Sequence, residues 1–323
     1  MKNKVFVLGG SGFIGTHLAQ QLLGQNHELV NLDINDPIDQ DQKSFHFNCD
    51  VRQPIPEKFG KDAQVIFNLA AVHRTPGHPS NEYFETNILG AQNVCDFARA
   101  NNINTIVFTS SIAVYGTYEA QKNEETMPMP DIPYGISKLS AEHIHKVWYN
   151  EDPENRRLII IRPGVVFGKH EKGNFTRLIN SISKGYFFYP GRTDTRKGCI
   201  YVKDLVQLML DRTNNNEPRS ETINASYKPS PKISTIVESI KKQTKKGSIT
   251  LKLPPLALIL ASRVLFNIFG KKSFHPDRIK KLMISNDING EKMKSLTHPK
   301  YGLELGIKDW LEETNYSQNK KVY

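Results

Sequence analysis

Hydrophobic and polar residues follow two different periods along the first half of the chain. A short apolar run ends at Leu8 and precedes a cluster of glycines, after which Ile14, Leu18 and Leu22 recur at helical spacing. Other short apolar runs are typical of strands, and helical patterns lie between several of them: 28–32, 45–47, 64–69 and 105–109. Strands that alternate with helices favour parallel pairing. We therefore expect an α/β fold built on a doubly wound parallel sheet.

The pattern changes after Arg162. Proline, glycine and lysine become more frequent, the elements become short and mixed, and the alternation of strands and helices does not continue. We therefore expect the sheet domain to occupy residues 1–164 and a smaller, mostly helical region that covers a substrate to occupy 165–315. Residues 316–323 are expected to form a frayed tail.

The composition is that of a folded, water-soluble protein: of 323 residues, 38% are hydrophobic and 24% are charged. The three cysteines form no CxxC pair and no Cys/His group at zinc-ligand spacing, so we expect reduced thiols, no metal and a cytoplasmic location. The apolar run from Leu253 to Phe269 contains Arg263 and Asn267 and is shorter than the roughly 20 residues of a spanning helix. We expect no stable membrane insertion.

The formal net charge is +10, and the basic excess is conspicuous in the last third of the chain. A solvated basic face, a diphosphate substrate or a nucleic-acid surface would each account for it. No nucleic-acid motif and no basic stripe interleaved with aromatic residues accompanies the charge. We favour the solvated face over the diphosphate substrate and expect no nucleic-acid partner.

A glycine-rich turn follows the first predicted strand and opens the first predicted helix, which is the context that a dinucleotide-binding turn requires. Glycine permits the sharp turn, the close approach of a pyrophosphate and tight packing of the helix on the strand. The helix N-terminus offers free N–H groups to phosphate. A plain structural turn is the alternative. The candidate cofactor-binding residues here are Gly9, Gly12, Phe13, Ile14 and Gly15.

Asp33 ends the second predicted strand, where a carboxylate can accept hydrogen bonds from both hydroxyls of the adenosine ribose. A carboxylate at that place repels a 2′-phosphate, and no Arg or Lys lies in residues 34–36. The sequence therefore favours NAD over NADP. An aspartate that only stabilises the turn is the alternative.

Ser110 and Ser111 end another predicted strand, and Tyr134 and Lys138 lie four positions apart on a predicted helix, so they share one helix face. A phenol of pKa about 10 is a poor base at neutral pH, and a neighbouring ammonium lowers that pKa. A Tyr-x-x-x-Lys pair alone is common on protein surfaces. After a dinucleotide turn and a Ser-Ser strand end, it predicts a catalytic group of Ser111, Tyr134 and Lys138.

Together these motifs resemble the extended short-chain dehydrogenase/reductases, and within them the NAD-dependent sugar-nucleotide epimerase/dehydratase group. The resemblance spans nearly the whole chain, through the segments 9–15, 49–52, 68–71, 86–90, 110–116, 134–138 and 162–163. It implies a Rossmann-type fold, NAD as cofactor and a homodimer formed through helices near 81–100 and 134–149. It adds cofactor-binding residues: Asp50 and Val51 at the adenine, Leu69, Ala70 and Ala71 along the ribose and pyrophosphate, Asn87 behind the nicotinamide, and Tyr134, Lys138 and Pro163.

The same resemblance implies a nucleoside-diphosphate sugar as substrate, with uridine diphosphate as the expected carrier and cell-surface polysaccharide synthesis as the context. Lys197 occupies a phosphate position at which the family has arginine. A solvated charge is the alternative for the residues of the C-terminal half. The candidate substrate-binding residues are Ser110, Ser111, Asn174, Lys197 and Arg278.

Departures from the family pattern bear on the reaction. Ile112 and Ala113 stand where 4,6-dehydratases carry Asp and Glu, which disfavours dehydration. We expect a 4-epimerase acting on a UDP-hexose or N-acetylhexosamine, and the alternative is an NAD(P)H-dependent 4-keto-6-deoxy sugar-nucleotide reductase. Val165 departs from the epimerase pattern, so the sugar stays open. A non-catalytic cofactor sensor or nucleic-acid-binding protein on the same fold is the third alternative, against which the intact Ser111, Tyr134 and Lys138 argue.

Overall fold

The computed structural model describes residues 4–73, 77–213, 218–244, 248–269 and 283–316. The chain divides into two compact units, and each is described by itself. Unit 1 comprises Met1–Gly116, Thr126–Pro163 and Leu205–Ala225. Unit 2 comprises Thr117–Glu125, Gly164–Asp204 and Ser226–Tyr323.

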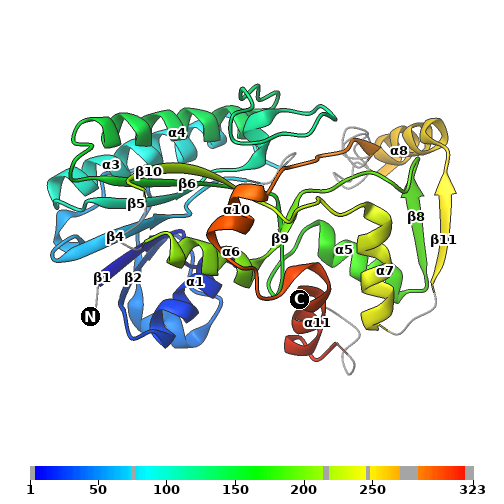
Figure 1. Ribbon diagram of the computed structural model, residues 1–323, viewed down its shortest axis with the longest axis horizontal. Helices are drawn as coiled ribbons and strands as arrows, with labels where there is room; N and C mark the ends of the chain where they lie inside the picture. The colour runs from blue at the N-terminus through cyan, green and yellow to red at the C-terminus, as the bar shows by residue number, and fades with distance from the viewer. Residues whose placement is uncertain (1–3, 74–76, 214–217, 245–247, 270–282, 317–323) are drawn as a thin grey trace. The chain divides into compact units, whose positions relative to one another are not determined.

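Unit 1 is built on a seven-stranded sheet in which every neighbouring pair is parallel, in the order β10-β6-β5-β4-β1-β2-β3. The predicted doubly wound sheet is confirmed, with α3 and α4 on one face and α1 on the other (Figure 1). The strands are β1 (Lys4–Leu8), β2 (Glu28–Asp33), β3 (His46–Asn48), β4 (Ala63–Asn68), β5 (Thr105–Thr109), β6 (Arg157–Pro163) and β10 (Ser220–Ala225). The helices are α1 (Phe13–Gly24), α2 (Ser80–Phe84), α3 (Gly90–Ala100) and α4 (Pro133–Asn150), with single turns η1 (Gln40–Phe45), η2 (Glu57–Phe59), η3 (Glu85–Leu89) and η4 (Ile112–Tyr115).

The edge strand β10 lies far beyond the expected domain boundary near residue 164, in a segment where the sequence pattern indicates no strand. Its sequence is mostly polar, so it lacks the apolar run that marks the other strands. It pairs with β6, whose seven residues are all buried, and β6 therefore has a neighbouring strand on each side. The pairing partner, and not a local pattern, makes this segment a strand.

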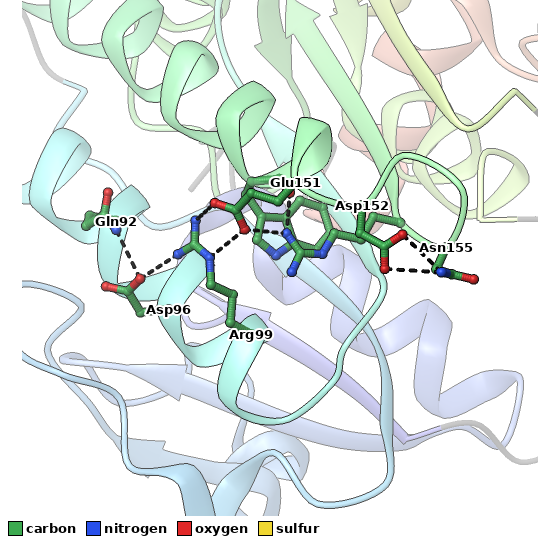
Figure 2. A network of polar contacts seen from close by, with 8 residues as sticks. Gln92, Asp96, Arg99, Glu151, Asp152 and Asn155 are labelled. Carbon is green, nitrogen blue, oxygen red and sulfur yellow. Dashed lines mark hydrogen bonds and ion pairs between the residues drawn. The ribbon is translucent and has the colours of Figure 1, made fainter.

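The core of unit 1 packs α3 and α4 against the sheet, and it includes Phe6, Phe97, Phe108 and Trp148. Outside this core a surface network joins the ends of the two helices (Figure 2). Arg99 of α3 donates from Nε and Nη2 to Glu151, at 2.8 and 2.6 Å. Hydrogen bonds from Arg99 and then Arg156 lower the pKa of Glu151 to about 2, so these links persist in mild acid.

Unit 2 contains two small parallel sheets, β7 (Val165–Phe167) with β9 (Cys199–Tyr201), and β8 (Tyr186–Pro190) with β11 (Ile249–Leu253). Helix α5 packs on β8 and on α7, and α11 packs on α7 and β9. Its other helices are shorter or peripheral, and α6 runs from unit 2 into unit 1 at Leu205. The helices are α5 (Asn174–Ser183), α6 (Val202–Asp211), α7 (Ile233–Thr244), α8 (Pro255–Phe269), α10 (Glu291–Leu296) and α11 (Gly302–Glu313).

Three chemical features follow from this fold. Cys49, Cys95 and Cys199 are buried free thiols, and burial raises the pKa of the Cys95 thiol to about 12. Across the described part of the chain, no helix has the length and apolarity needed to cross a membrane. Within that same part, no cluster of His, Cys, Asp and Glu side chains is suited to a metal ion.

Candidate active site

The glycine turn lies between β1 and α1 at the carboxyl edge of the sheet. Gly9 has φ +78°, and a Cβ there would lie 2.7 Å from the main-chain nitrogen of Ala70. A Cβ on Gly15 would lie 2.5 Å from Gly9 O and from Gly10 Cα. A Cβ at either position would therefore clash with the main chain, so this turn requires glycine there. The loop after β4, which contains Leu69, Ala70 and Ala71, lies directly against the turn.

The start of α1 is suited to an anion. Gly12 precedes the helix without a side-chain capping hydrogen bond, and the first turn of α1 contains no acidic residue. Phe13 and Ile14 begin the helix and are half-buried. The first N–H groups of a helix carry partial positive charge and bind phosphate well.

Asp33 ends β2 beside the same turn. Its carboxylate is buried, and it accepts a hydrogen bond from the Ser11 N–H at 3.0 Å and from the Asn35 N–H at 2.9 Å. These bonds fix the carboxylate beside the glycine turn. The Asn35 side-chain amide also donates to Oδ1, at 3.3 Å, so acceptor capacity remains on Oδ2. Three features together fit the diphosphate and ribose of NAD. They are the glycine turn, which has no room for a Cβ, the start of α1 without a side-chain cap, and the fixed carboxylate of Asp33.

The other predicted cofactor residues of unit 1 surround this edge. The Asp50 carboxylate forms an ion pair with Arg52 at 2.6 Å, which lowers the pKa of Asp50. Val51 directs its side chain into the core against α3, so only its main chain could face a nucleotide. Pro163 is the buried last residue of β6.

Asn87 links the loop after β4 to helix α4. Its side chain exchanges hydrogen bonds with the main chain of Val72, at 2.9 and 3.1 Å. It also donates to the hydroxyl of Ser137 at 2.8 Å, and that hydroxyl donates to the Tyr134 carbonyl at 2.9 Å. Asn87 therefore helps to position the first turn of α4, on which Tyr134 lies.

Ser111, Tyr134 and Lys138 come together at the end of β5. Ser111 follows the strand and accepts from the Ala113 N–H at 3.1 Å, and Tyr134 and Lys138 lie on the first two turns of α4. Burial raises the pKa of the Tyr134 phenol, and a hydrogen bond with Ser111 acts in the opposite direction. The structure thus places the tyrosine and serine hydroxyls in contact, as a shared proton-exchange site requires.

Lys138 is almost completely buried. Its ammonium donates to the Thr109 carbonyl at 2.8 Å and lies over the Phe108 ring. Burial lowers the pKa of Lys138 to about 7, against the opposing effect of the Glu142 carboxylate. The lysine therefore titrates in the physiological range, so nearby charge can switch it between its two forms.

A buried polar network beneath these residues escaped the sequence reasoning. Glu142 accepts from Ser110 at 2.5 Å and forms a two-bond ion pair with Arg162, at 2.8 and 2.6 Å. Arg162 also donates to the Tyr115 hydroxyl at 2.9 Å, and Tyr115 donates to Asn224 of β10 at 2.8 Å. Ser110 is thus directed into the interior. Glu142 lies four positions after Lys138, so helical spacing was the signal that could have revealed it.

His145 completes the buried side of α4. Its Nδ1–H donates to the Ala141 carbonyl at 2.7 Å, so Nε2 accepts from the Asn68 amide at 3.3 Å. The ring stacks on Phe108 with centroids 4.2 Å apart. Burial lowers the pKa of His145 to about 4, which keeps it neutral and makes it a spacer, not a proton carrier, at neutral pH.

The predicted substrate residues of the C-terminal half belong to unit 2. Asn174 is the exposed first residue of α5, and its side chain accepts from Arg177 at 2.7 Å. Lys197 donates to the Ile284 carbonyl at 2.7 Å, and burial lowers its pKa to about 8. Arg278 lies outside the described residues.

The fold and this site define an NAD-dependent enzyme of the short-chain dehydrogenase/reductase type. Residues 5–226 match the model of the NAD dependent epimerase/dehydratase family, and the chain belongs to that family. The family resemblance, the fold class and NAD as cofactor, all expected from the sequence, are thereby confirmed.

The chain is 31% identical over 306 residues to the N-acetyl-alpha-D-glucosaminyl-diphospho-ditrans,octacis-undecaprenol 4-epimerase of Escherichia coli O157:H7, covering 91% of this chain and 90% of the relative. Solved structures share its fold at lower identity. MoeE5 in complex with UDP-glucuronic acid and NAD matches at TM-score 0.78 with 20% identity, covering 98% of this chain and 100% of the other. The UDP-N-acetylglucosamine 4-epimerase of Bacillus cereus matches at TM-score 0.75 with 19% identity, covering 97% of each chain.

Proposed function

We propose that this protein is an NAD-dependent 4-epimerase that acts on a hexose or N-acetylhexosamine linked to a diphosphate carrier, UDP in the first instance. The observation that carries the proposal is the contact of Tyr134 with Ser111 beside the buried Lys138, at the edge of the sheet that also presents the glycine turn. The long match to a 4-epimerase supports the choice of reaction. A 4,6-dehydratase needs an acidic residue at the position of Ile112, and Ile112 is apolar and buried, so dehydration is disfavoured.

In this proposal Tyr134 takes the proton of the sugar C4 hydroxyl and later returns it, while Ser111 holds the same oxygen by a hydrogen bond. NAD, when bound, supplies the hydride acceptor and donor for C4 and a positive charge near the phenol. Lys138 stabilises the phenolate form of Tyr134, which burial alone disfavours. Return of the proton after the 4-keto sugar has presented its other face completes inversion at C4.

The remaining predicted residues take supporting roles. We assign Gly9, Gly12, Phe13, Ile14, Gly15, Asp33, Asp50, Val51, Leu69, Ala70, Ala71, Asn87, Tyr134, Lys138 and Pro163 to the cofactor, and Ser110, Ser111, Asn174, Lys197 and Arg278 to the substrate. The assignment of Ser110 is indirect, because its hydroxyl donates to Glu142. Lys197 suits a diphosphate, since an anion would favour its charged form.

A second candidate substrate carries the sugar on a lipid diphosphate in place of UDP. The name of the E. coli O157:H7 relative specifies an undecaprenol-linked N-acetylglucosamine, and that relative matches along nine-tenths of both chains. Both carriers present the same diphosphate and the same C4 hydroxyl, so the residues of unit 1 do not distinguish them.

The decisive experiment is incubation of the purified protein with NAD and UDP-glucose, UDP-N-acetylglucosamine or undecaprenyl-diphosphate-linked N-acetylglucosamine, without added NADH. We expect the C4 epimer of at least one of these substrates and no net change in NADH absorbance. Stoichiometric NADH oxidation with a 4-keto-6-deoxy sugar nucleotide, and no epimer from any of the three, would identify the reductase instead.

We also propose that the protein is a cytoplasmic homodimer. Ile136 and Val147 are exposed on α4, and Leu89 is exposed at the end of η3, where the family expectation places the dimer contact. Burial of such side chains is the usual driving force of association. Sedimentation of the unmodified protein and of Val147→Glu tests this, and a monomer in both cases would contradict it.

A further inference from the structure

Unit 2 presents a set of large apolar side chains to solvent on three structural elements, β8, β11 and α8. Their exposed fractions range from 42 to 76%. We call this set the apolar face of unit 2, and it consists of Tyr186, Phe188, Ile249, Leu251, Leu256, Leu260 and Val264. An exposed apolar surface of this extent marks an interaction site in a water-soluble protein more often than chance.

The strand pair β8–β11 contributes four of these residues on one side. Ile249 pairs with Tyr186 and Leu251 pairs with Phe188, so all four side chains point the same way. The Tyr186 and Phe188 rings lie 5.8 Å apart. The intervening residue Phe187 points to the opposite side, toward Tyr189, which is buried. The pair therefore has one packed side and one uncovered side.

Helix α8 carries the other three residues of the apolar face. It begins directly after β11 and lies beside the ends of β8 and β11 (Figure 1). Leu256, Leu260 and Val264 recur every four residues and thus form one stripe of the helix, whereas Ser262 is buried. Exposure of such an apolar stripe is unfavourable in water alone.

The charge of this region indicates what covers the face. Residues 239–276 of the sequence include no Asp or Glu, although they include eight Lys or Arg residues. Arg263 of α8 is exposed and follows Leu260 by three positions, so it lies on the same side of the helix, whereas the exposed Lys252 of β11 pairs with Tyr189 and points to the other side of the strand pair. Aromatic, aliphatic and basic side chains in one surface are the combination that binds the boundary of an anionic lipid bilayer.

We propose that the apolar face of unit 2 docks on the surface of an anionic membrane. The aliphatic and aromatic side chains enter the boundary between headgroups and acyl chains, and Arg263 contacts lipid phosphates. The protein lies on the bilayer and does not cross it. This inference goes beyond the proposed reaction and holds for either diphosphate carrier.

The test is flotation of the purified full-length protein with vesicles of phosphatidylcholine alone or mixed with phosphatidylglycerol. We expect binding to the mixed vesicles that weakens with added salt, and little binding to phosphatidylcholine. The variant Leu256→Gln/Leu260→Gln/Val264→Gln should lower the partition coefficient by at least about tenfold. Leu305→Gln, an equally exposed leucine of α11 outside the face, should bind as the unmodified protein does.

Three results would overturn the proposal. The first is no binding of the unmodified protein to mixed vesicles, and the second is equal binding by the triple variant. The third is that the unmodified protein forms a dimer that the triple variant alone does not form. The last result would show that a second copy covers the face. Circular dichroism of the triple variant establishes that it is folded. Tyr134→Phe, which lacks the proposed catalytic group, should still bind vesicles, so failure of the docking proposal and failure of the proposed reaction are distinguishable.

Discussion

Buried cations are held in two ways in this protein, by carboxylates and by main-chain carbonyls. In unit 1 Arg162 pairs with Glu142 and Arg212 pairs with Glu221, and each of these four side chains is at most 4% exposed. The buried Arg157 of the same unit donates to the main-chain carbonyls of Thr213 and Arg212.

In unit 2 Lys122 donates to the Tyr118 carbonyl and Lys197 to the Ile284 carbonyl, whereas the half-buried Lys203 forms ion pairs with Asp309 and Glu313. Burial lowers the pKa of Lys122 and of Lys197, while the hydrogen bonds of Lys203 with its two carboxylates outweigh burial and raise its pKa. A buried charge is tolerated when it is paired, and without such a pair it shifts toward its neutral form.

Lys138 lies in unit 1 but is held like Lys122 and Lys197 of unit 2, by a carbonyl and with a lowered pKa. The contrast separates two tasks within unit 1. The arginine–glutamate pairs stabilise the fold, while Lys138 remains able to change its charge. The predictions on Glu142, Glu221 and Lys138 below test this separation.

The largest expected effect is on turnover. Tyr134→Phe removes the proton-exchanging hydroxyl, so kcat should fall by about 10² to 10⁴. NAD affinity and the free energy of unfolding should change little, because the ring remains. The steady-state rate of C4 epimer formation measures the effect. Tyr149→Phe, on the same helix, is the matched control, and near-normal turnover of Tyr134→Phe would remove the catalytic assignment.

The next effect is on stability. Glu142→Gln leaves the Arg162 guanidinium buried without its carboxylate partner, and loss of one partner of a buried pair costs about 3 to 5 kcal/mol. Urea denaturation should give that loss in the free energy of unfolding. Glu221→Gln removes the matched carboxylate of Arg212 and should cost a similar amount.

The two variants should differ in function. Glu142 also holds Ser110 and acts on the charge of Lys138, so Glu142→Gln should lower kcat of the folded fraction. Glu221 pairs with Arg212, which is not one of the proposed catalytic residues, so its variant should retain kcat. Equal turnover in both folded variants would show that the Glu142 network is only structural.

The features predicted from the sequence are those that local spacing determines. The glycine turn, Asp33 at the end of β2 and the Tyr134–Lys138 pair each depend on a few consecutive residues, and the structure places them at one edge of the sheet. Glu142 lies four positions after Lys138 and so shares the helix face of the Tyr134–Lys138 pair, but a glutamate on a helix is usually exposed. Its burial depends on Arg162, which a different element supplies.

Long-range contacts account for what the sequence pattern did not show. Asn224 accepts from Tyr115 only because β10 pairs with β6, and the polar sequence of β10 does not mark it as a strand. Lys197 likewise contacts a carbonyl 87 positions away. No local periodicity encodes either contact.

A smaller effect concerns the fixed carboxylate at the glycine turn. Asp33→Ala removes the predicted acceptor of the ribose hydroxyls, and one lost charge-assisted hydrogen bond costs about 1.5 to 3 kcal/mol. NAD affinity should therefore fall by about ten- to a hundredfold in calorimetry. Asp36→Ala, at an exposed neighbouring position, should not change it. Equal affinity of the unmodified protein for NAD and NADP would contradict the role given to Asp33.

The smallest effect is the pH dependence that Lys138 gives to stability. Its pKa is about 7 in the folded protein, against an ordinary value of 10.5. Between these values the unfolded chain holds more protons than the folded one, so this lysine makes stability rise with pH, by at most about 1.4 kcal/mol per pH unit. The variant Lys138→Met lacks this pH-dependent contribution to stability. The variant Lys146→Met, at an exposed position of the same helix, retains it and is the control. Urea denaturation from pH 7.5 to 8.5, without NAD, measures the free energy of unfolding of the unmodified protein and of Lys138→Met. The value for the unmodified protein minus the value for Lys138→Met should increase with pH. A constant difference would mean that Lys138 stays charged, as the paired arginines of unit 1 do.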